Sequence, residues 1–291
     1  MALRAEQRPD AGVPVRDTEW SVGRSQRSPW WLELLVVAWL LWVYDAVNNH
    51  APLRLHAALA HARSILQLEN WLHLNFELSL NHLAAAHAGI ALPVADFYDT
   101  AHFVVTLGLA FLLWWKFPRI YRPLRNTLVL INVVGFIVFW LYPLAPPRML
   151  PSSGFVDVVA VTHAFGSWRA GMVASQANEL AAMPSLHIAW ACWSALAGWR
   201  MLGPRRWRAV VWLYPALTGL AVMSTANHFF LDVVAGVATI ALAYWLAEVL
   251  SALAQRPGPQ TLLITARGRA NVLAGRLRRR APTTPLPADS D

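Results

Sequence analysis

The stretch HFFLDVVAGVATIALAYWLAEVLSA, residues 228–252, decides the fold. It is apolar and long enough to cross a bilayer core, which needs about 20 helical residues. Yet it opens on a histidine and contains an aspartate four residues later. Ionisable side chains are costly in membrane-spanning helices and usually mark a functional site. This segment therefore predicts a membrane protein with a reactive site at one end of a span.

The composition of the whole chain agrees with a membrane protein. Hydrophobic residues make up 57% of the 291 residues and charged residues only 14%, with sixteen Trp. That is too apolar for a soluble domain of this size. The net charge of +8 could suggest nucleic acid. However, the basic residues are spread over short loops and two tails, so we expect a membrane and no nucleic acid as partner.

Five more apolar runs accompany this stretch. They cover residues 30–47, 97–115, 127–144, 184–202 and 207–225. Between the first two, residues 48–96 place apolar side chains at helical spacing among polar ones, which indicates one or two amphipathic helices at the membrane interface. The expected fold is all-α: a six-span transmembrane helical bundle over residues 29–253, with an interfacial amphipathic segment. A polar tail, 1–28, precedes it, and a basic, unstructured tail, 254–291, follows.

The basic residues predict how the spans are oriented, since short cytoplasmic loops carry the excess of Lys and Arg. They cluster in both tails and in two connections: Lys116, Arg119, Arg122 and Arg125 in one, and Arg200, Arg205, Arg206 and Arg208 in the other. We therefore expect a multi-pass protein of the cell membrane with both termini cytoplasmic. Residues 142–187 and 227–232 then lie on the extracytoplasmic side.

Two polar stretches on that side carry groups suited to phosphoryl chemistry. His228 and Asp232 share one face of a helix, so the carboxylate can hold the imidazole by its Nδ1 proton and leave Nε2 as a nucleophile. The sequence Pro-Ser-Leu-His at 184–187 opens another span. Proline favours a first helical turn, whose free N–H groups bind anions. Ser185 adds a hydroxyl donor, and His187 an acid that can protonate a departing alkoxide.

A third stretch, Tyr-Pro-Leu-Ala-Pro-Pro-Arg at 142–148, ends a span on the same side. Its prolines stiffen the backbone, so we expect Arg148 on a defined turn, where a guanidinium can hold a phosphate through two parallel hydrogen bonds. An interfacial arginine that touches lipid headgroups is the alternative, and the sequence leaves both open.

Together these stretches resemble the type 2 phosphatidic acid phosphatase superfamily, whose second and third signature motifs contain Pro-Ser-x-His and His-x-x-x-Asp. Residues 142–148 and 181–187 are similar to its inositol phosphorylceramide synthase-like, or inositolphosphotransferase, branch. The resemblance covers roughly residues 60–250. It implies that His228 attacks phosphorus to form a phosphohistidine and that Asp232 orients it. It also implies that His187 protonates the leaving oxygen, while Arg148 and Ser185 hold the phosphoryl oxygens.

The chain departs from the family pattern in two places. The third motif usually begins Ser-Arg, where this chain has Ala221 and Val222, so one phosphate-binding cation is missing. The first motif, Lys-x6-Arg-Pro, has a near match from Lys116 to Arg122-Pro123 that is one residue too short. The expected topology places this match a membrane thickness from both histidines, so we interpret its charges as orientation signals.

Other polar residues allow a functional and a simpler interpretation. Asp99 and His102, at the expected outer entrance of the second span, are candidates for a headgroup pocket, with an interfacial cap as the alternative. Glu69, His73 and Glu77 follow one another at four-residue intervals, a spacing that metal ligands can use. Nothing nearby completes such a site, so a solvated polar face is favoured. We expect no metal and no cofactor.

The favoured function is a membrane lipid phosphate phosphatase or headgroup phosphotransferase that acts on the extracytoplasmic face. Hydrolysis and transfer share the phosphohistidine half-reaction and differ in what attacks it. The partners are a lipid phosphate substrate and, for transfer, a lipid or polyol acceptor, and the long loop 149–183 is expected to select them. A catalytically idle transporter or scaffold is the alternative of another class. The sequence identifies neither the lipid nor the oligomeric state.

Overall fold

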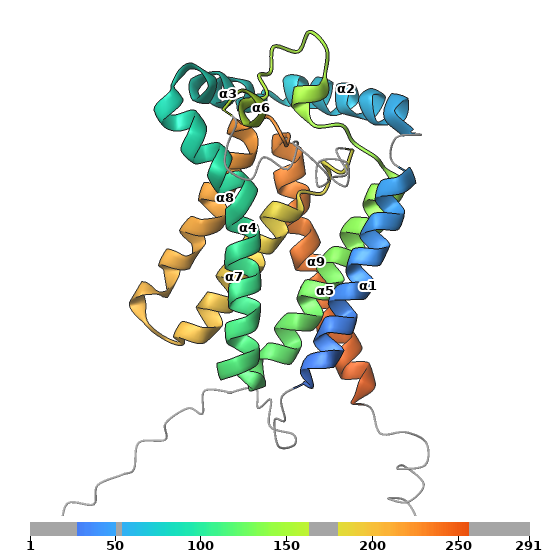
Figure 1. Cartoon of the computed structure of the whole chain (residues 1–291), viewed down its shortest axis with the longest axis vertical. Coiled ribbons are helices and arrows are strands. Elements are labelled where there is room, and N and C mark those ends of the chain that lie inside the picture. The colour runs from blue at the N-terminus through green and yellow to red at the C-terminus, as the bar shows by residue number, and fades with distance from the viewer. Residues whose placement is uncertain (1–27, 51–53, 163–179, 256–291) are drawn as a thin grey trace, which may run out of the picture. The chain divides into compact units, whose positions relative to one another are not determined.

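A computed structural model describes residues 28–50, 54–162 and 180–255, and within them the chain is helical, with one isolated bridge between Leu144 and Ala181 (Figure 1). The tails predicted at 1–28 and 254–291 lie almost wholly outside these residues. By contacts the chain divides into Met1–Tyr244 and Trp245–Asp291, and α9 runs from the first unit into the second. The elements are α1 (Trp30–His50), α2 (Leu55–Leu72), α3 (Glu77–Ala86), α4 (Ala88–Lys116), α5 (Pro118–Leu141), the 3₁₀ turn η2 (Pro147–Met149), α6 (Val158–Thr162), α7 (Leu186–Leu202), the 3₁₀ segment η4 (Arg206–Trp212), α8 (Leu213–Ser224) and α9 (Phe230–Ala254).

All six apolar runs of the sequence form helices, which confirms the all-α fold class. Four of these helices, α1, α4, α5 and α9, are long and apolar enough to cross a membrane. The other two runs form shorter helices, because α7 has 17 residues and α8 has 12, with η4 leading directly into α8. A bundle of six spans and an interfacial position for α2 and α3 therefore stay predictions.

The helices that contain the second and third expected spans begin earlier than those spans. Helix α4 begins at Ala88 and α5 at Pro118, each nine residues before the predicted start, and Phe117 alone separates them. Proline is favoured at the first position of a helix, so Pro118 can begin α5 immediately after this break. The arginines expected in a connection lie on the first turns of α5 instead. Arg125 there forms a 3.0 Å ion pair with Glu33 of α1.

Helix α7 lies in the interior of the bundle, where it packs against α4, α5 and α8. Trp193 is fully buried and its indole N–H donates to the carbonyl of Leu124 at 2.8 Å. Thr106 of α4 and Ser194 of α7 bring their hydroxyls within 3.3 Å of each other. These contacts hold α7 on both sides, and they fix the depth at which its first turn, with His187, enters the bundle.

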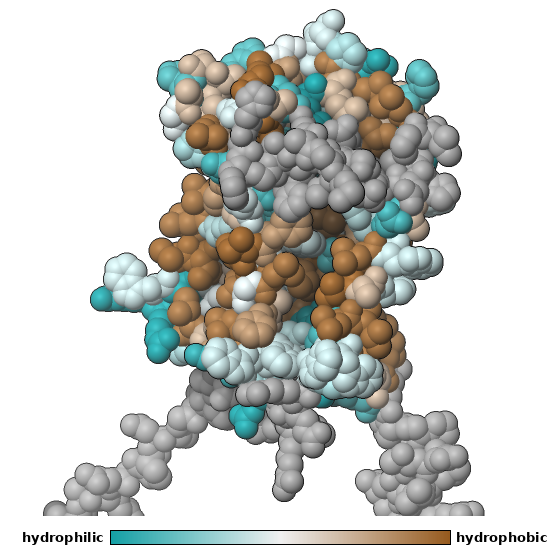
Figure 2. All heavy atoms as spheres, in the orientation of Figure 1, coloured by the Kyte–Doolittle hydropathy of each residue, from teal (hydrophilic) through white to brown (hydrophobic). Residues whose placement is uncertain are grey.

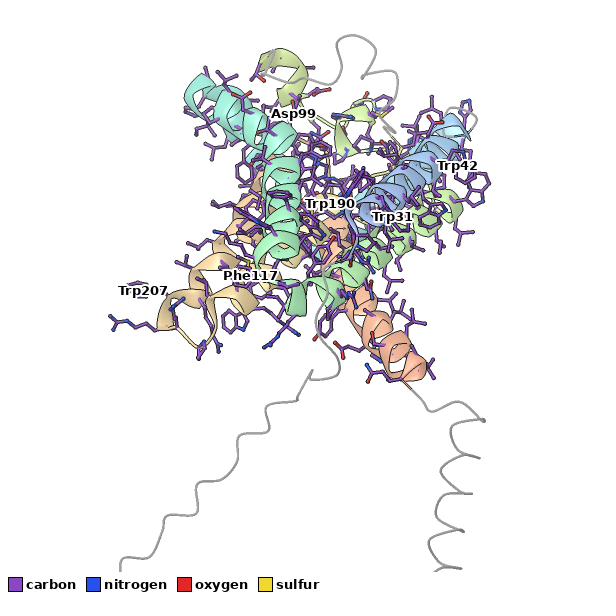
Figure 3. The ribbon with its side chains drawn as sticks, turned by 60° about the horizontal axis from the view of Figure 1, so that its bottom comes forward. Trp31, Trp42, Asp99, Phe117, Trp190 and Trp207 are labelled. Atoms are coloured by element: carbon purple, nitrogen blue, oxygen red, sulfur yellow. The ribbon has the colours of Figure 1, made fainter. Side chains whose placement is uncertain are left out.

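The outer surface is apolar along the helices. Figure 2 shows hydrophobic residues over the middle of the helices on the face in view and hydrophilic residues toward both ends. Trp42 on α1 and Trp207 on η4 point outward and are each more than half exposed (Figure 3). An exposed apolar surface of this extent is typical of lipid contact, and tryptophan is enriched where the bilayer meets water.

Gly236 allows α9 to approach the start of α7. A methyl group at this position would lie 2.6 Å from the carbonyl oxygen of Ser185 and 2.9 Å from Cβ of Ile188. Both distances are far below van der Waals contact, and the nearer atom belongs to the backbone. The absence of a side chain at Gly236 therefore sets the distance between α7, which carries His187, and α9, which His228 precedes.

We expect Gly236→Ala to lower the free energy of unfolding by about 1–3 kcal/mol, because an extra methyl group in a packed interior forces the backbone to shift. The measurement is thermal unfolding of the purified protein in detergent. Gly108→Ala is the matched control, since Gly108 lies in α4 with open space around it. There the loss of a helical glycine should stabilise the protein by about 0.5–1 kcal/mol. Equal stability of the two variants would contradict the close-approach argument.

Candidate active site

His228 lies in the short connection between α8 and α9 and is held there by backbone hydrogen bonds. Its own N–H donates to the carbonyl of Val222 at 3.2 Å. Two residues earlier, the carbonyl of Ala226 accepts a hydrogen bond from the N–H of Arg148 at 3.1 Å. The connection is therefore tied to α8 and to η2, and His228 is buried within it.

The imidazole of His228 has two defined neighbours. Its Nδ1 lies 2.8 Å from the carbonyl oxygen of Ala182 and 3.4 Å from Oδ2 of Asp232. A carbonyl can only accept, so Nδ1 carries the proton and Nε2 keeps its lone pair. Nε2 lies 3.4 Å from Nδ1 of His187. The pairing expected with Asp232 is thus present as the longer contact, and a backbone carbonyl that the sequence did not indicate makes the shorter one.

Asp232 is fully buried and also caps the start of the helix that carries it. Its Oδ2 accepts a hydrogen bond from the N–H of Phe229 at 2.9 Å, as an acidic residue in the first turn of a helix can do for the residue that precedes the helix. Its carbonyl oxygen accepts from the N–H of Ser185 at 3.1 Å. One residue therefore links the start of α9, the start of α7 and the ring of His228.

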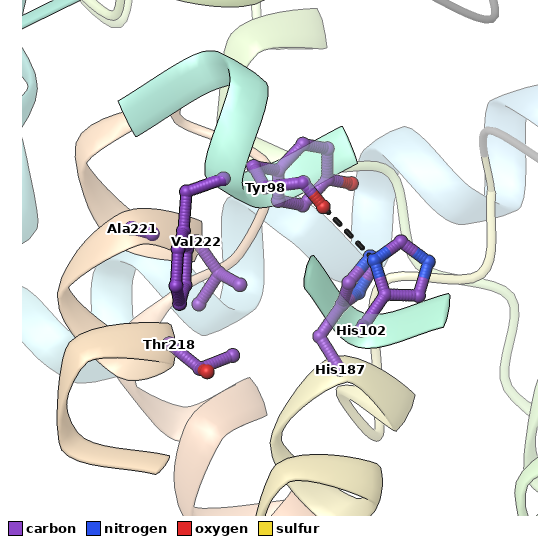
Figure 4. Close-up of a pocket in the computed structure, with 7 residues that line it drawn as sticks. Tyr98, His102, His187, Thr218, Ala221 and Val222 are labelled. Carbon is purple, nitrogen blue, oxygen red and sulfur yellow. Dashed lines mark hydrogen bonds between the residues drawn. The ribbon is translucent and has the colours of Figure 1, made fainter. Parts of the chain in front are cut away.

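His187 is packed between aromatic rings of α4. The ring of Tyr98 stacks on it with centroids 4.6 Å apart, and the ring of His102 meets it edge-on at 4.4 Å. Nδ1 of His102 donates to the carbonyl of Tyr98 at 2.9 Å (Figure 4). Of the two headgroup-pocket candidates, His102 therefore touches a predicted catalytic residue, whereas Asp99 is buried on the same helix.

A small pocket adjoins His187 between α4, α7 and α8 (Figure 4). Its lining is mostly apolar and comprises Phe97, Tyr98, His102, His187, Thr218, Ala221 and Val222. Ala221 and Val222 are the two positions at which the family motif usually has Ser-Arg. The departure noted in the sequence thus produces an uncharged wall beside His187.

Arg148 and Ser185 supply polar groups near the two histidines. Arg148 lies on η2 with a side chain that is only 7% exposed, and its Nε lies 3.6 Å from Oδ2 of Asp157. This burial argues against the interfacial alternative. The hydroxyl of Ser185 is buried and has no hydrogen-bond partner among the described residues. Since buried polar atoms nearly always find a partner, this hydroxyl is a candidate for a ligand contact.

The near match to the first family motif lies far from these groups. Lys116 ends α4, and Arg122 lies on the first turns of α5, whereas Arg148 follows the end of α5. The 24 residues of α5 span about 36 Å at the rise of an α-helix. This distance agrees with the interpretation of Lys116 and Arg122 as orientation charges. Of the loop expected to select the substrate, 149–183, residues 163–179 lie outside the described residues.

The interpretation of Glu69 and Glu77 as part of a solvated face is wrong, because both side chains are 0% exposed. Oε1 of Glu69 accepts a hydrogen bond from the N–H of Leu231 at 2.7 Å, in the first turn of α9. The four-residue spacing wrongly suggested one continuous helical face. Helix α2 ends at Leu72, and His73 adopts a left-handed backbone conformation, which turns the chain. The sequence around His73, Trp-Leu-His-Leu-Asn-Phe at 71–76, contains no proline or glycine that would mark that turn.

Asn81 is another buried residue that the sequence analysis missed. Its amide nitrogen donates to the carbonyls of Val156 and Ser224, both at 2.9 Å, and its oxygen accepts from the N–H of Val156 at 2.8 Å. These three bonds join α3 to the loop after η2 and to the end of α8. Asn81 thereby supports the connection that carries His228.

The sequence of this chain also resembles those of known proteins. Residues 63–246, more than half of the chain, match the profile of the PAP2 superfamily. The chain belongs to the PAP2 superfamily. The resemblance on which the expected roles of His187, His228 and Asp232 rest is thereby confirmed at the level of the family.

Among PAP2 relatives, the chain is similar to the phosphoinositol dihydroceramide synthase of Bacteroides thetaiotaomicron. The two are 23% identical over 187 residues, which cover 54% of this chain and 60% of the synthase. This similarity supports the resemblance to the inositol phosphorylceramide synthase-like branch. The chain spans less than two thirds of that relative's length. No solved structure matches it.

We expect Asn81→Ala to lower the free energy of unfolding by about 1–3 kcal/mol, because it leaves buried backbone groups of Val156 and Ser224 without a partner. Thermal unfolding in detergent measures this loss. Asn75→Ala is the control, since Asn75 is exposed and, among the described residues, its side chain bonds to the side chain of Asn70. That variant should stay within about 0.5 kcal/mol of the wild type. A loss at Asn81 no larger than at Asn75 would show that the three bonds do not stabilise this region.

Proposed function

We propose that this protein is an integral membrane lipid phosphate phosphatase or headgroup phosphotransferase that works through a phosphohistidine on His228. The observation that carries this proposal is the 2.8 Å contact between Nδ1 of His228 and the carbonyl of Ala182. It places the proton on Nδ1 and leaves the lone pair of Nε2 toward His187. A nucleophile beside a proton donor is the arrangement that a two-step phosphoryl transfer needs.

In the first step, Nε2 of His228 attacks phosphorus, a P–N bond forms, and the bond from phosphorus to the leaving alcohol oxygen breaks. His187 donates a proton to that oxygen, so the alcohol departs neutral. Asp232 and the carbonyl of Ala182 stabilise the positive charge on the phosphorylated ring. In the second step, water or an acceptor alcohol gives its proton to His187 and attacks phosphorus, which breaks the P–N bond and restores His228.

Arg148 and Ser185 are proposed to hold the phosphoryl oxygens during both steps. The guanidinium of Arg148 can exchange its contact with Asp157 for a phosphate, to which it can make two parallel hydrogen bonds. The buried hydroxyl of Ser185 adds one donor, and the first turn of α7 contributes N–H groups and the positive end of its dipole. No metal ion is required by this arrangement of donors.

Transfer to an acceptor alcohol is the second form of this function. The similarity to a phosphoinositol dihydroceramide synthase favours it. The small pocket beside His187 has an apolar wall made by Ala221, Val222 and Phe97. A catalytically idle transporter or scaffold is disfavoured, because such a protein has no need for a nucleophile with a fixed tautomer.

We also propose the membrane arrangement that the basic residues predict. Residues 29–253 would form the catalytic domain in the cell membrane, with six spans and α2 and α3 at the extracytoplasmic interface. The tails, 1–28 and 254–291, would lie in the cytoplasm. The four helices with sufficient length and hydropathy, together with the exposed apolar surface along them, support a membrane protein.

The central test of the function uses the full-length protein in detergent with phosphatidic acid, and with an inositol phospholipid plus dihydroceramide. We expect His228→Ala to lose about 10³-fold or more of the activity of the wild type, since the nucleophile is removed. His187→Ala should lose about 10²–10⁴-fold, since the general acid is removed. His56→Ala, an exposed histidine of α2, is the control and should be fully active. Equal phosphate release and headgroup transfer by all four proteins would exclude the mechanism.

The membrane arrangement has a separate test. A reporter enzyme that is active only outside the cytoplasm, fused after Asp291, should be inactive, because the arginine clusters keep both tails inside. A fusion after Asn227, at the proposed outer end of α8, is the control and should be active. The reverse pattern would place His187 and His228 on the cytoplasmic face.

A further inference from the structure

The turn between α2 and α3 brings two glutamates together beneath the start of α9. Glu69 lies on the last turn of α2, and Glu77 begins α3. The N–H groups of His73 and Leu74 donate back to the carbonyls of Asn70 and Glu69, at 3.2 and 2.8 Å, which closes the turn. Both carboxyl groups are completely buried and lie within hydrogen-bonding reach of each other.

Only one of the four carboxyl oxygens has a donor among the described residues. Oε1 of Glu69 accepts from the N–H of Leu231, whereas Oε2 of Glu69 and both oxygens of Glu77 have no such partner. Asp232, which approaches from α9, also has a buried Oδ1 without a donor there. The described part of the chain places no Lys or Arg in an ion pair with either glutamate.

A proton shared by the two glutamates would supply the missing hydrogen-bond donor. Two ionised carboxylates side by side in a buried place repel each other, and neither would keep its hydration. If one carboxyl keeps its proton, its O–H donates to the other, and each then has a partner. Burial, the hydrogen bond to Glu77 and the charges of Glu77 and Asp232 together raise the pKa of Glu69 to about 9, against the opposing effect of the Leu231 N–H.

We propose that Glu69 and Glu77 share one proton and that this protonated pair is a positioning device for the active site. Through Leu231 it holds the first turn of α9, and with it Asp232, against His228. Phe76, just before Glu77, packs on Phe230 with ring centroids 5.1 Å apart and holds the same turn from the apolar side. The effect on catalysis rests on the proposed function, whereas the shared proton does not.

Because of this pair, stability and activity should fall as the pH rises. The pKa of Glu69 is higher in the folded protein, about 9, than its ordinary value of 4.5, so the folded state binds more protons between these values. Stability is therefore greatest near the lower value and falls as pH rises toward 9. The charged and titratable groups that face Glu69 are Glu77 from α3 and Asp232 from α9, and His228 stands beside Asp232.

Infrared spectroscopy of the full-length protein in detergent tests the shared proton directly. The wild type should show the carbonyl-stretch band of a protonated carboxylic acid at pH 7, and this band should disappear as pH rises through about 9. Glu69→Gln should lack it, because the amide of glutamine donates to Glu77 in place of the proton. Glu248→Gln, near the end of α9, is the control and should keep the band. A wild-type spectrum without a protonated carboxylic acid at pH 7 would overturn the proposal, whatever the variants do.

Thermal unfolding provides a second readout that needs no substrate. The midpoint of the wild type should fall between pH 5 and 9, and Glu69→Gln should reduce that fall. A pH dependence that is identical in both proteins would contradict the shared proton. A cation bound between the carboxyls would instead appear as a midpoint that falls on treatment with a chelator or on removal of Na⁺, Mg²⁺ and Ca²⁺, and that outcome would also overturn it.

Activity of the same variants tests the positioning role. With whichever of the lipids named above the wild type turns over, Glu69→Ala should lower kcat/KM by about 10- to 100-fold, because small displacements of reacting groups have effects of that size. Glu69→Gln, which keeps the acceptor for Leu231, should retain most of the activity and lose less of it at alkaline pH. Equal losses in both variants would show that the pair does not position the site. If the wild type is inactive on every lipid, the proposed function fails, and the infrared and unfolding results still decide the shared proton.

Discussion

The start of α9 is the constraint on which the site depends. The first N–H groups of a helix have no partner within the helix, and here they are buried, so other residues must accept from them. Asp232 accepts from Phe229, and Glu69 accepts from Leu231. Both acceptors are carboxyl groups, which suit the positive end of a helix dipole. His228 lies just before this turn, and Asp232 contacts its ring. The residues that accept from this helix end therefore also orient His228, the proposed nucleophile.

This arrangement explains how the site can differ from the usual motif of its superfamily. Where a Ser-Arg pair is usual, α8 presents Ala221 and Val222, and the only buried arginine that the structure describes near the histidines is Arg148, on η2. The N–H of Arg148 donates to Ala226, within the His228 connection. We propose that Arg148 supplies, from a different element, the cation that the usual motif provides, while Ala221 and Val222 line the apolar side of the pocket beside His187.

The sequence predicted the parts of this structure that follow from local rules. The long apolar runs predicted the helices. The polar residues where two of these runs begin, at 184–187 and 228–232, predicted a site with His187, His228 and Asp232. It could not predict the carbonyl of Ala182 as the partner of His228, because backbone acceptors carry no sequence signal. Nor could it distinguish Glu69 from a residue on a solvated face, because the partner of Glu69 is Leu231 of α9, which lies 162 residues away in the chain. Long-range contacts of this kind are set by packing and not by periodicity.

The most direct measurement is a structure of the full-length protein with orthovanadate, which takes the place of a phosphoryl group in transfer. We expect vanadium bonded to Nε2 of His228, with Nδ1 still hydrogen-bonded to the carbonyl of Ala182. We also expect vanadate oxygens within hydrogen-bonding distance of Arg148 and of the hydroxyl of Ser185. Vanadate bound away from His228, or bonded to it through Nδ1, would contradict the assignment of the nucleophile.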